Sequence, residues 1–152
     1  MGPIKDVIDI VTELGGIKTP EAADKLFAER LDEVHLDRLN KVKNEAVRLK
    51  IANAIVLCDP DSVFINTASD EDRQFIRDLS LEKGEEKTLP MEKHTIHFDL
   101  KEEQGRIIDR TFYISNEGEE VNSLANKMDR KEAFDDIQNK MTGIMRGKKM
   151  MI

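Results

Sequence analysis

The chain has 152 residues, of which 39% are apolar and 36% charged, and its formal net charge at pH 7 is −7. This suits one soluble globular domain, and the negative charge argues against nucleic acid, which needs a basic surface. No apolar run is long enough to cross a membrane, and the amino end lacks the apolar segment of a secretory signal. A single cysteine, Cys58, excludes an internal disulfide framework. We therefore expect a cytoplasmic protein that contacts neither nucleic acid nor membrane.

Helical patterns dominate the first third of the chain. Residues 3–14 have apolar positions at helical spacing, and Gly15-Gly16 is a typical helix stop. Thr19-Pro20 is a second start signal, because threonine can cap a helix and proline fits its first position. The apolar pattern then runs through residues 20–56, but its phase slips near His35. That slip predicts two helices or one bent helix.

The middle of the chain mixes strands and helices. A turn at residues 59–61 precedes a β-rich run, Ser62–Thr67, which predicts a short strand. Ser69 is a typical helix cap and Gly84 a typical helix end, so a helix is expected between them. We expect a charged loop over residues 85–90.

Strict alternation over residues 94–100 predicts a strand whose Ile96, Phe98 and Leu100 face a core. A further strand is expected over Arg110–Ser115. One or two helices are expected after these strands, over residues 121–128 and 130–141.

The final residues, 142–152, read as a helix exit, a basic turn and the first half of a buried strand. Because natural termini are usually exposed, we expect this chain to be the front part of a longer protein. The elements together predict an α/β fold, in which a mixed β-sheet has flanking helices and a helical N-terminal extension covers residues 1–48.

Three stretches resemble GTP-dependent phosphoenolpyruvate carboxykinases. Residues 145–152 (MRGKKMMI) resemble that family's MKGRTMYV segment, and residues 105–114 (GRIIDRTFYI) its A-R-I-x-S-K-T-V-x-V passage. Residues 52–65 resemble its early passage of helix, Cys-x-Pro-Asp and strand. The resemblance spans residues 49–152 and identifies them as the α/β part of the family's N-terminal domain, ending before the nucleotide-binding domain. It leaves residues 1–48 without a clear counterpart.

The resemblance implies an enzyme that converts oxaloacetate and GTP into phosphoenolpyruvate, carbon dioxide and GDP, a reaction of gluconeogenesis. Such an enzyme uses Mn²⁺ or Mg²⁺ beside GTP/GDP. In the family the nucleotide site and the metal ligands lie beyond the region that this chain resembles. We therefore expect the chain to hold no cofactor itself, to be inactive alone, and to have the missing C-terminal portion as its partner.

Arg106 is the candidate substrate-binding residue, and no catalytic or metal-binding residue is assigned. It follows Gly105 at the entrance to an expected strand, and its planar guanidinium can pair with a carboxylate through two hydrogen bonds. The resemblance implies that Arg106 binds the carboxylated substrate, oxaloacetate or phosphoenolpyruvate. The alternative is a surface arginine in an ordinary ion pair. Arg110, nearby, is given no catalytic role.

The basic cluster of Arg146, Lys148 and Lys149 around Gly147 has two interpretations. It could bind a phosphate or an anionic substrate at the mouth of a site. The favoured interpretation is a solvated turn between a helix and a strand, where basic residues suit the helix C-terminus.

The histidines and the cysteine point to no chemistry. His94 and His97 fall on opposite faces of an expected strand and so cannot share a metal ion, and we expect them and His35 to face solvent. Cys58 has acidic neighbours and no visible base, which predicts a buried structural thiol.

A second function class stays open at this point. A stand-alone, non-enzymatic α/β adaptor could bind a partner through the amphipathic helices of residues 20–56.

Overall fold

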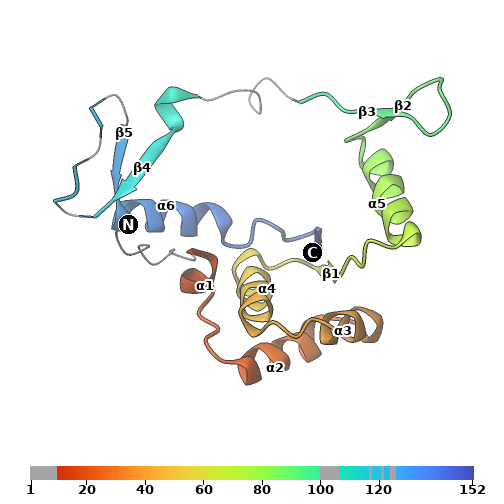
Figure 1. Ribbon diagram of the computed structural model, residues 1–152, viewed down its shortest axis with the longest axis horizontal. Coiled ribbons are helices and arrows are strands. Elements are labelled where there is room, and N and C mark those ends of the chain that lie inside the picture. The colour runs from red at the N-terminus through yellow and green to blue at the C-terminus, as the bar shows by residue number, and fades with distance from the viewer. Residues whose placement is uncertain (1–9, 100–106, 117, 121, 124–125) are drawn as a thin grey trace, which may run out of the picture. The chain divides into compact units, whose positions relative to one another are not determined.

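The computed structural model describes residues 10–99, 107–116, 118–120, 122–123 and 126–152 (Figure 1). The chain forms two compact units, the first made of Met1–Ile65 with Asp129–Ile152 and the second of Asn66–Met128. Helices alternate with three two-stranded sheets, β1–β6, β2–β3 and β4–β5, which confirms the predicted α/β class. Within the described ranges, no helix has the length and hydropathy needed to span a bilayer.

The first unit is mainly helical. Its helices are α1 (Ile10–Gly15), α2 (Pro20–Arg30), α3 (Glu33–Asn40), α4 (Glu45–Cys58) and α6 (Arg130–Met141). The Thr19 side chain caps α2 by accepting from the amide of Ala22 at 3.3 Å, as predicted. The long helical pattern gives three helices rather than two, because Asn44 caps a further helix start by accepting from the amide of Val47.

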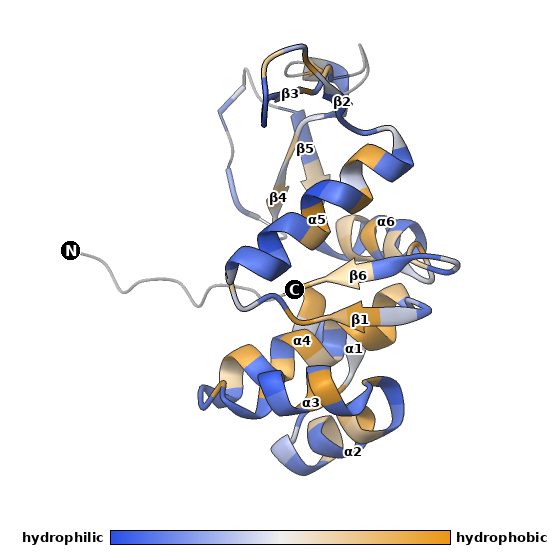
Figure 2. Cartoon of the chain, turned by 90° about the vertical axis from the view of Figure 1, so that its right-hand side faces the viewer, coloured by the Kyte–Doolittle hydropathy of each residue, from blue (hydrophilic) through white to orange (hydrophobic). Residues whose placement is uncertain are grey.

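The sheet of the first unit joins two segments that lie far apart in the sequence. β1 (Ser62–Phe64) pairs in parallel with β6 (Lys149–Met151), and Val63 stands opposite Met150 (Figure 2). The amide of Ile152 continues this ladder by donating to the Phe64 carbonyl at 2.9 Å. The strand predicted after the basic turn is therefore confirmed.

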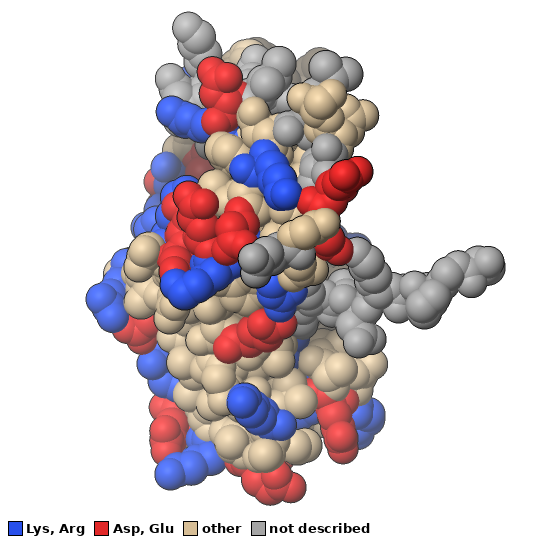
Figure 3. All heavy atoms as spheres, turned by 90° about the vertical axis from the view of Figure 1, so that its left-hand side faces the viewer, with Lys and Arg blue, Asp and Glu red and all other residues tan. Residues whose placement is uncertain are grey.

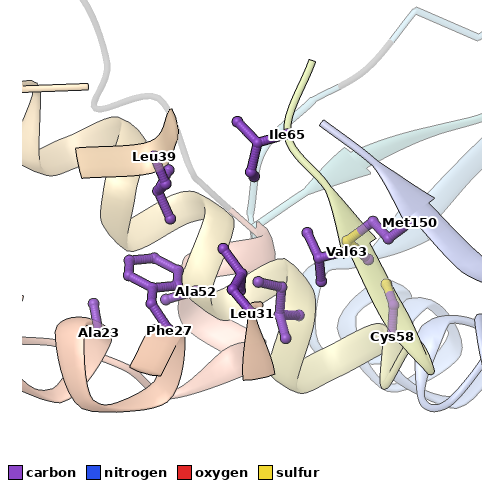
Figure 4. Close-up of a cluster of buried hydrophobic side chains, with 10 residues drawn as sticks. Ala23, Phe27, Leu31, Leu39, Ala52, Cys58, Val63, Ile65 and Met150 are labelled. Atoms are coloured by element: carbon purple, nitrogen blue, oxygen red, sulfur yellow. The ribbon is translucent and has the colours of Figure 1, made fainter. Parts of the chain in front are cut away.

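Both the helices and the sheet of the first unit contribute to one core (Figure 4). Its buried members are Ala23, Phe27, Leu31, Leu39, Ala52, Ile55, Cys58, Val63, Ile65 and Met150. Helices before residue 48 thus pack in the same core as β1 and β6. The boundary predicted between a helical extension (residues 1–48) and an α/β part (residues 49–152) stays a prediction.

The second unit has one long helix and short strands. Its elements are α5 (Asp70–Lys83), β2 (Lys87–Thr88), β3 (Thr95–Ile96), the 3₁₀ turn η1 (Ile108–Arg110), β4 (Phe112–Ser115) and β5 (Asn126–Asp129), whose last residue belongs to the first unit. Ser69 caps α5 by accepting from the Asp72 amide at 3.1 Å, and Gly84 ends it with φ +77°. Both signals were predicted correctly from local chemistry.

Four other predictions for this unit are wrong in whole or in part. The strand expected over residues 94–100 has only two residues, and it pairs with β2, inside the stretch expected to be a loop. Phe98 was expected in a core, but 73% of it is exposed, and Leu100 lies outside the described residues. The helix expected over residues 121–128 does not form as predicted, because Asn126–Asp129 is strand β5, paired with β4.

Candidate functional site

The leading candidate, Arg106, lies outside the described residues, and so does Gly105. The described chain resumes at Ile107, whose carbonyl accepts from the Arg110 amide at 3.0 Å in turn η1. Arg110 is exposed and lies before β4 begins at Phe112. The substrate-binding role of Arg106 stays a prediction.

The basic turn is tied to the junction between α4 and β1. The Arg146 Nε donates to Asp59 Oδ2 at 2.9 Å, and the amide of Gly147 donates to Asp61 Oδ1 at 2.8 Å. The Asp61 amide in turn donates to the Lys148 carbonyl at 3.0 Å. These bonds bring the start of β6 beside the start of β1.

Asp59 is the centre of this junction. It ends α4 in the left-handed conformation, with φ 49° and ψ 58°. Its Oδ1 accepts from both terminal nitrogens of Arg30, at 3.1 and 3.2 Å, while Arg30 also donates to the Pro60 carbonyl at 2.6 Å. Hydrogen bonds from Arg146 and then Arg30 hold the pKa of the Asp59 carboxyl below its ordinary value.

This geometry favours the structural interpretation of the basic turn over the anion-binding one. The guanidinium of Arg146 and the amide of Gly147 already donate hydrogen bonds to carboxylates of the chain itself. Lys148 and Lys149 are exposed, so they add charge at the surface. On the described part of the face in Figure 3, basic and acidic side chains are interspersed, without the broad basic surface that nucleic acid requires.

His35 has a role that the sequence did not reveal. Its Nδ1 accepts a hydrogen bond from the Ile65 amide at 3.1 Å, and its ring centroid lies 4.9 Å from that of Phe64. Arg38, one turn later on α3, donates to the Ile65 carbonyl at 2.8 Å. His35 is half-buried, so its predicted exposure is wrong, and it serves to hold the chain at the end of β1.

The other two histidines are exposed, as predicted. His94 Nδ1 lies 2.8 Å from the Glu92 carbonyl oxygen, and His97 Nε2 lies 3.1 Å from Asp99 Oδ1. Among the residues that the structure describes, no three His, Cys, Asp or Glu side chains gather as metal ligands would.

Cys58 is buried, and burial raises the pKa of its thiol. A raised pKa keeps the sulfur protonated at neutral pH, whereas a nucleophile must be a thiolate. The prediction of a structural thiol is confirmed for its burial.

Asn53 is a second residue that sequence reasoning missed. It is fully buried on α4, where its Oδ1 accepts from the Ile17 amide at 2.7 Å and its Nδ2 donates to the Ile17 and Leu49 carbonyls. A Cβ placed on Gly15 would lie 2.5 Å from the Asn53 Cβ, so only glycine fits there. Asn53 thus anchors the link between α1 and α2 to α4.

Comparison with known proteins places the chain in context. The model of the phosphoenolpyruvate carboxykinase N-terminal domain matches residues 50–152. The protein named phosphoenolpyruvate carboxykinase [GTP] from Thermococcus sibiricus is 36% identical over 134 residues, which are 88% of this chain and 21% of that protein. The proteins of the same name from Pyrococcus furiosus and Saccharolobus solfataricus are 34% identical over 132 residues and 33% identical over 115, covering 21% and 19% of their lengths.

The chain therefore spans about a fifth of the length of these curated relatives. The 134-residue match is too long to be contained in residues 49–152, and it must include most of residues 1–48. The expectation that this front third has no counterpart is wrong.

Proposed function

The chain belongs to the phosphoenolpyruvate carboxykinase family, and on that premise we propose that it supplies one wall of the active site of an enzyme that converts oxaloacetate and GTP into phosphoenolpyruvate, carbon dioxide and GDP. The observation that carries this proposal is the match of residues 50–152 to the family's N-terminal domain. The relatives are named as GTP-dependent enzymes, which supports GTP as the nucleotide. Gluconeogenesis and the cytoplasm are the corresponding proposals for pathway and location.

The proposal gives the described residues no role in binding nucleotide or metal. Phosphoryl transfer is driven by positioning and charge neutralisation, through phosphate-binding amides, a lysine and metal ions. The described part of this chain has no cluster of three metal-ligating side chains that could hold Mn²⁺ or Mg²⁺. These parts would belong to the remaining four-fifths of a full-length enzyme, so the 152-residue chain alone should not turn over substrate.

Within that enzyme, Arg106 would bind a carboxylate of oxaloacetate or phosphoenolpyruvate. Two parallel hydrogen bonds from its guanidinium would orient the substrate so that the enolate oxygen faces the γ-phosphate. The support for this role is the Gly105-Arg106-Ile107 motif and the family resemblance that it carries.

The test is Arg106→Ala in the full-length enzyme. Loss of a charged hydrogen bond of about 1.5–3 kcal/mol should lower kcat/KM by roughly 10- to 150-fold, with a rise in KM. Arg110→Ala, which removes a neighbouring exposed arginine, is the matched control and should change kcat/KM by less than about twofold. Unchanged kinetics in Arg106→Ala would end the assignment.

A simpler assay tests the expected inactivity of the chain alone. The purified 152-residue chain should form no phosphoenolpyruvate from oxaloacetate, GTP and Mn²⁺. Formation of product would show that the reactive groups lie within these residues.

The burial of the helices of residues 20–56 supports the enzyme proposal over the adaptor interpretation. Most apolar side chains of α2, α3 and α4 pack in the core of their own unit, where Phe27, Leu39 and Ile55 are fully buried. A helix whose apolar face is occupied in this way cannot present the same face to a partner.

A further inference from the structure

The second unit exposes apolar side chains that its own described residues do not cover. β4 carries three in succession, with exposed fractions of 42% for Phe112, 60% for Tyr113 and 43% for Ile114. Side chains of a strand alternate between its faces, so Phe112 and Ile114 share one face and Tyr113 lies on the other. Large apolar groups are therefore exposed on both faces of the β4–β5 sheet.

Such a run is typical of a strand that is buried on both sides. A sheet of only two strands is marginal in water unless a further layer covers it. Among the described residues of the second unit, only Asp72 and Ser115 are buried, and neither is apolar. Phe98, Met91 and Leu89 add to the exposed apolar surface of the same unit.

We propose that Phe112, Tyr113 and Ile114 of β4 form a docking surface for the carboxyl-terminal portion of a full-length carboxykinase. This inference rests on the proposed function, because the chain spans 21% of the Thermococcus sibiricus relative and the occupant is the counterpart of the remainder. A second copy of the chain is a poorer occupant, since a net charge of −7 on each copy opposes self-association. Phe112 and Ile114 are exposed on one face of β4 and Tyr113 on the other, and exposed apolar surface of this kind usually marks an interaction site.

Amide hydrogen exchange tests the proposal in a chimera. In the chimera, this chain replaces the segment that it matches in the Thermococcus sibiricus enzyme, and the 152-residue chain is measured beside it. Amides of Phe112–Ser115 should exchange at least about tenfold more slowly in the chimera, because covered strands open less often. Amides of α4, within the first unit's core, should be protected in both proteins. Equal rates at Phe112–Ser115 in the two proteins would overturn the proposal.

Serine substitutions give a second readout. Phe112→Ser with Ile114→Ser should lower the Tm of the chimera by about 5 °C or more and leave that of the 152-residue chain unchanged. Val34→Ser is the matched control, since Val34 on α3 has an exposed fraction of 60% in the first unit, and it should change neither Tm. An equal effect of the double variant on both proteins would show that the β4 surface is covered within the chain itself.

The outcome also separates this inference from the proposed function. A chimera that slows exchange at β4 but forms no phosphoenolpyruvate would contradict the function and keep the docking surface. A chimera that forms product but leaves exchange at β4 unchanged would contradict the docking surface and keep the proposed function. If the chimera does not fold, the Thermococcus enzyme and its own matching segment replace it, and the peptide aligned with Phe112–Ser115 is compared under the same criterion.

Discussion

The two units of the chain differ in what they bury. In the first, side chains such as Phe27, Leu39 and Ile55 are excluded from solvent between helices and the β1–β6 sheet. In the described part of the second, the buried side chains are Asp72 and Ser115. Since burial of apolar surface is the main favourable term in folding, most of the stability resides in the first unit.

The second unit nevertheless has well-defined local structure. The amide and hydroxyl of Thr67 both donate to Asp72 Oδ2, at 2.8 and 2.6 Å, and the Ser69 cap and Gly84 stop define the ends of α5. Figure 2 shows α5 as a largely hydrophilic helix. Local hydrogen bonds can specify where a helix begins and ends without supplying the burial that would hold it against another layer. Local hydrogen bonds thus define the ends of α5, whereas apolar burial stabilises the first unit.

The largest effect is expected from two matched phenylalanine substitutions. Phe27→Ala in the first unit should lower the free energy of unfolding by about 3–5 kcal/mol, because it leaves a cavity and removes the ring under Arg48. Phe98→Ala in the second unit should change it by less than about 0.5 kcal/mol, since that ring is already 73% exposed. Urea unfolding followed by circular dichroism measures both changes. Similar losses of unfolding free energy would contradict the claim that the first unit holds most of the stability.

A smaller effect is expected at the polar anchor of the first unit. Asn53→Ala should lower the free energy of unfolding by about 1–3 kcal/mol, because the half-buried amide of Ile17 loses its acceptor. Asn66→Ala is the control: Asn66 is exposed in the second unit, and its Oδ1 accepts a local bond from the Ala68 amide. The same urea titration applies, and a loss at Asn66 as large as that at Asn53 would contradict the assigned anchor.

The smallest effect concerns pH and the Asp59 junction. Because the pKa of Asp59 is lower in the folded chain than its ordinary value, the carboxylate stabilises the fold above about pH 4. That contribution is lost as the pH falls from about 4 through the lowered pKa. Asp59→Asn tolerates the left-handed backbone but has no charge to lose, so its urea midpoint should fall less between pH 7 and pH 3 than that of the unsubstituted chain.

Asp37→Asn, at an exposed position of α3, is the control for that measurement. It should keep the pH dependence of the unsubstituted chain. Identical pH dependence in all three proteins would show that the two arginines do not stabilise the folded state through Asp59.

Features set by neighbouring residues could be predicted from the sequence. Thr19 and Ser69 cap helices, Gly84 ends one, and the apolar run after the basic turn becomes β6, because each depends on chemistry within a few residues. Asn44 followed by Glu45 carried a similar cap signal, which the longer apolar pattern concealed.

Features set by contacts between residues far apart in the sequence could not be predicted from it. His35 accepts from Ile65, and Asn53 binds Ile17, through contacts that no local pattern encodes. Asn126–Asp129 is a strand because β4 lies beside it, and the alternation that suggested a buried Phe98 has no covering layer within the described chain. At the candidate site, the hydrogen bond from Arg146 to Asp59 could be recognised only from the folded structure.

The pairing of β1 with β6 has a consequence for synthesis. Residues 66–128 form a separate unit inserted between the two segments that build the first, so translation delivers that whole insertion before Lys149 exists. A nascent polypeptide that has left the ribosome only as far as β5 lacks the strand that pairs with Val63. The loop that must then close is long, and long loops close slowly. Completion of the first unit's core is thus delayed until β6 is translated, and α1 to α4 are the part of that unit that can assemble earlier.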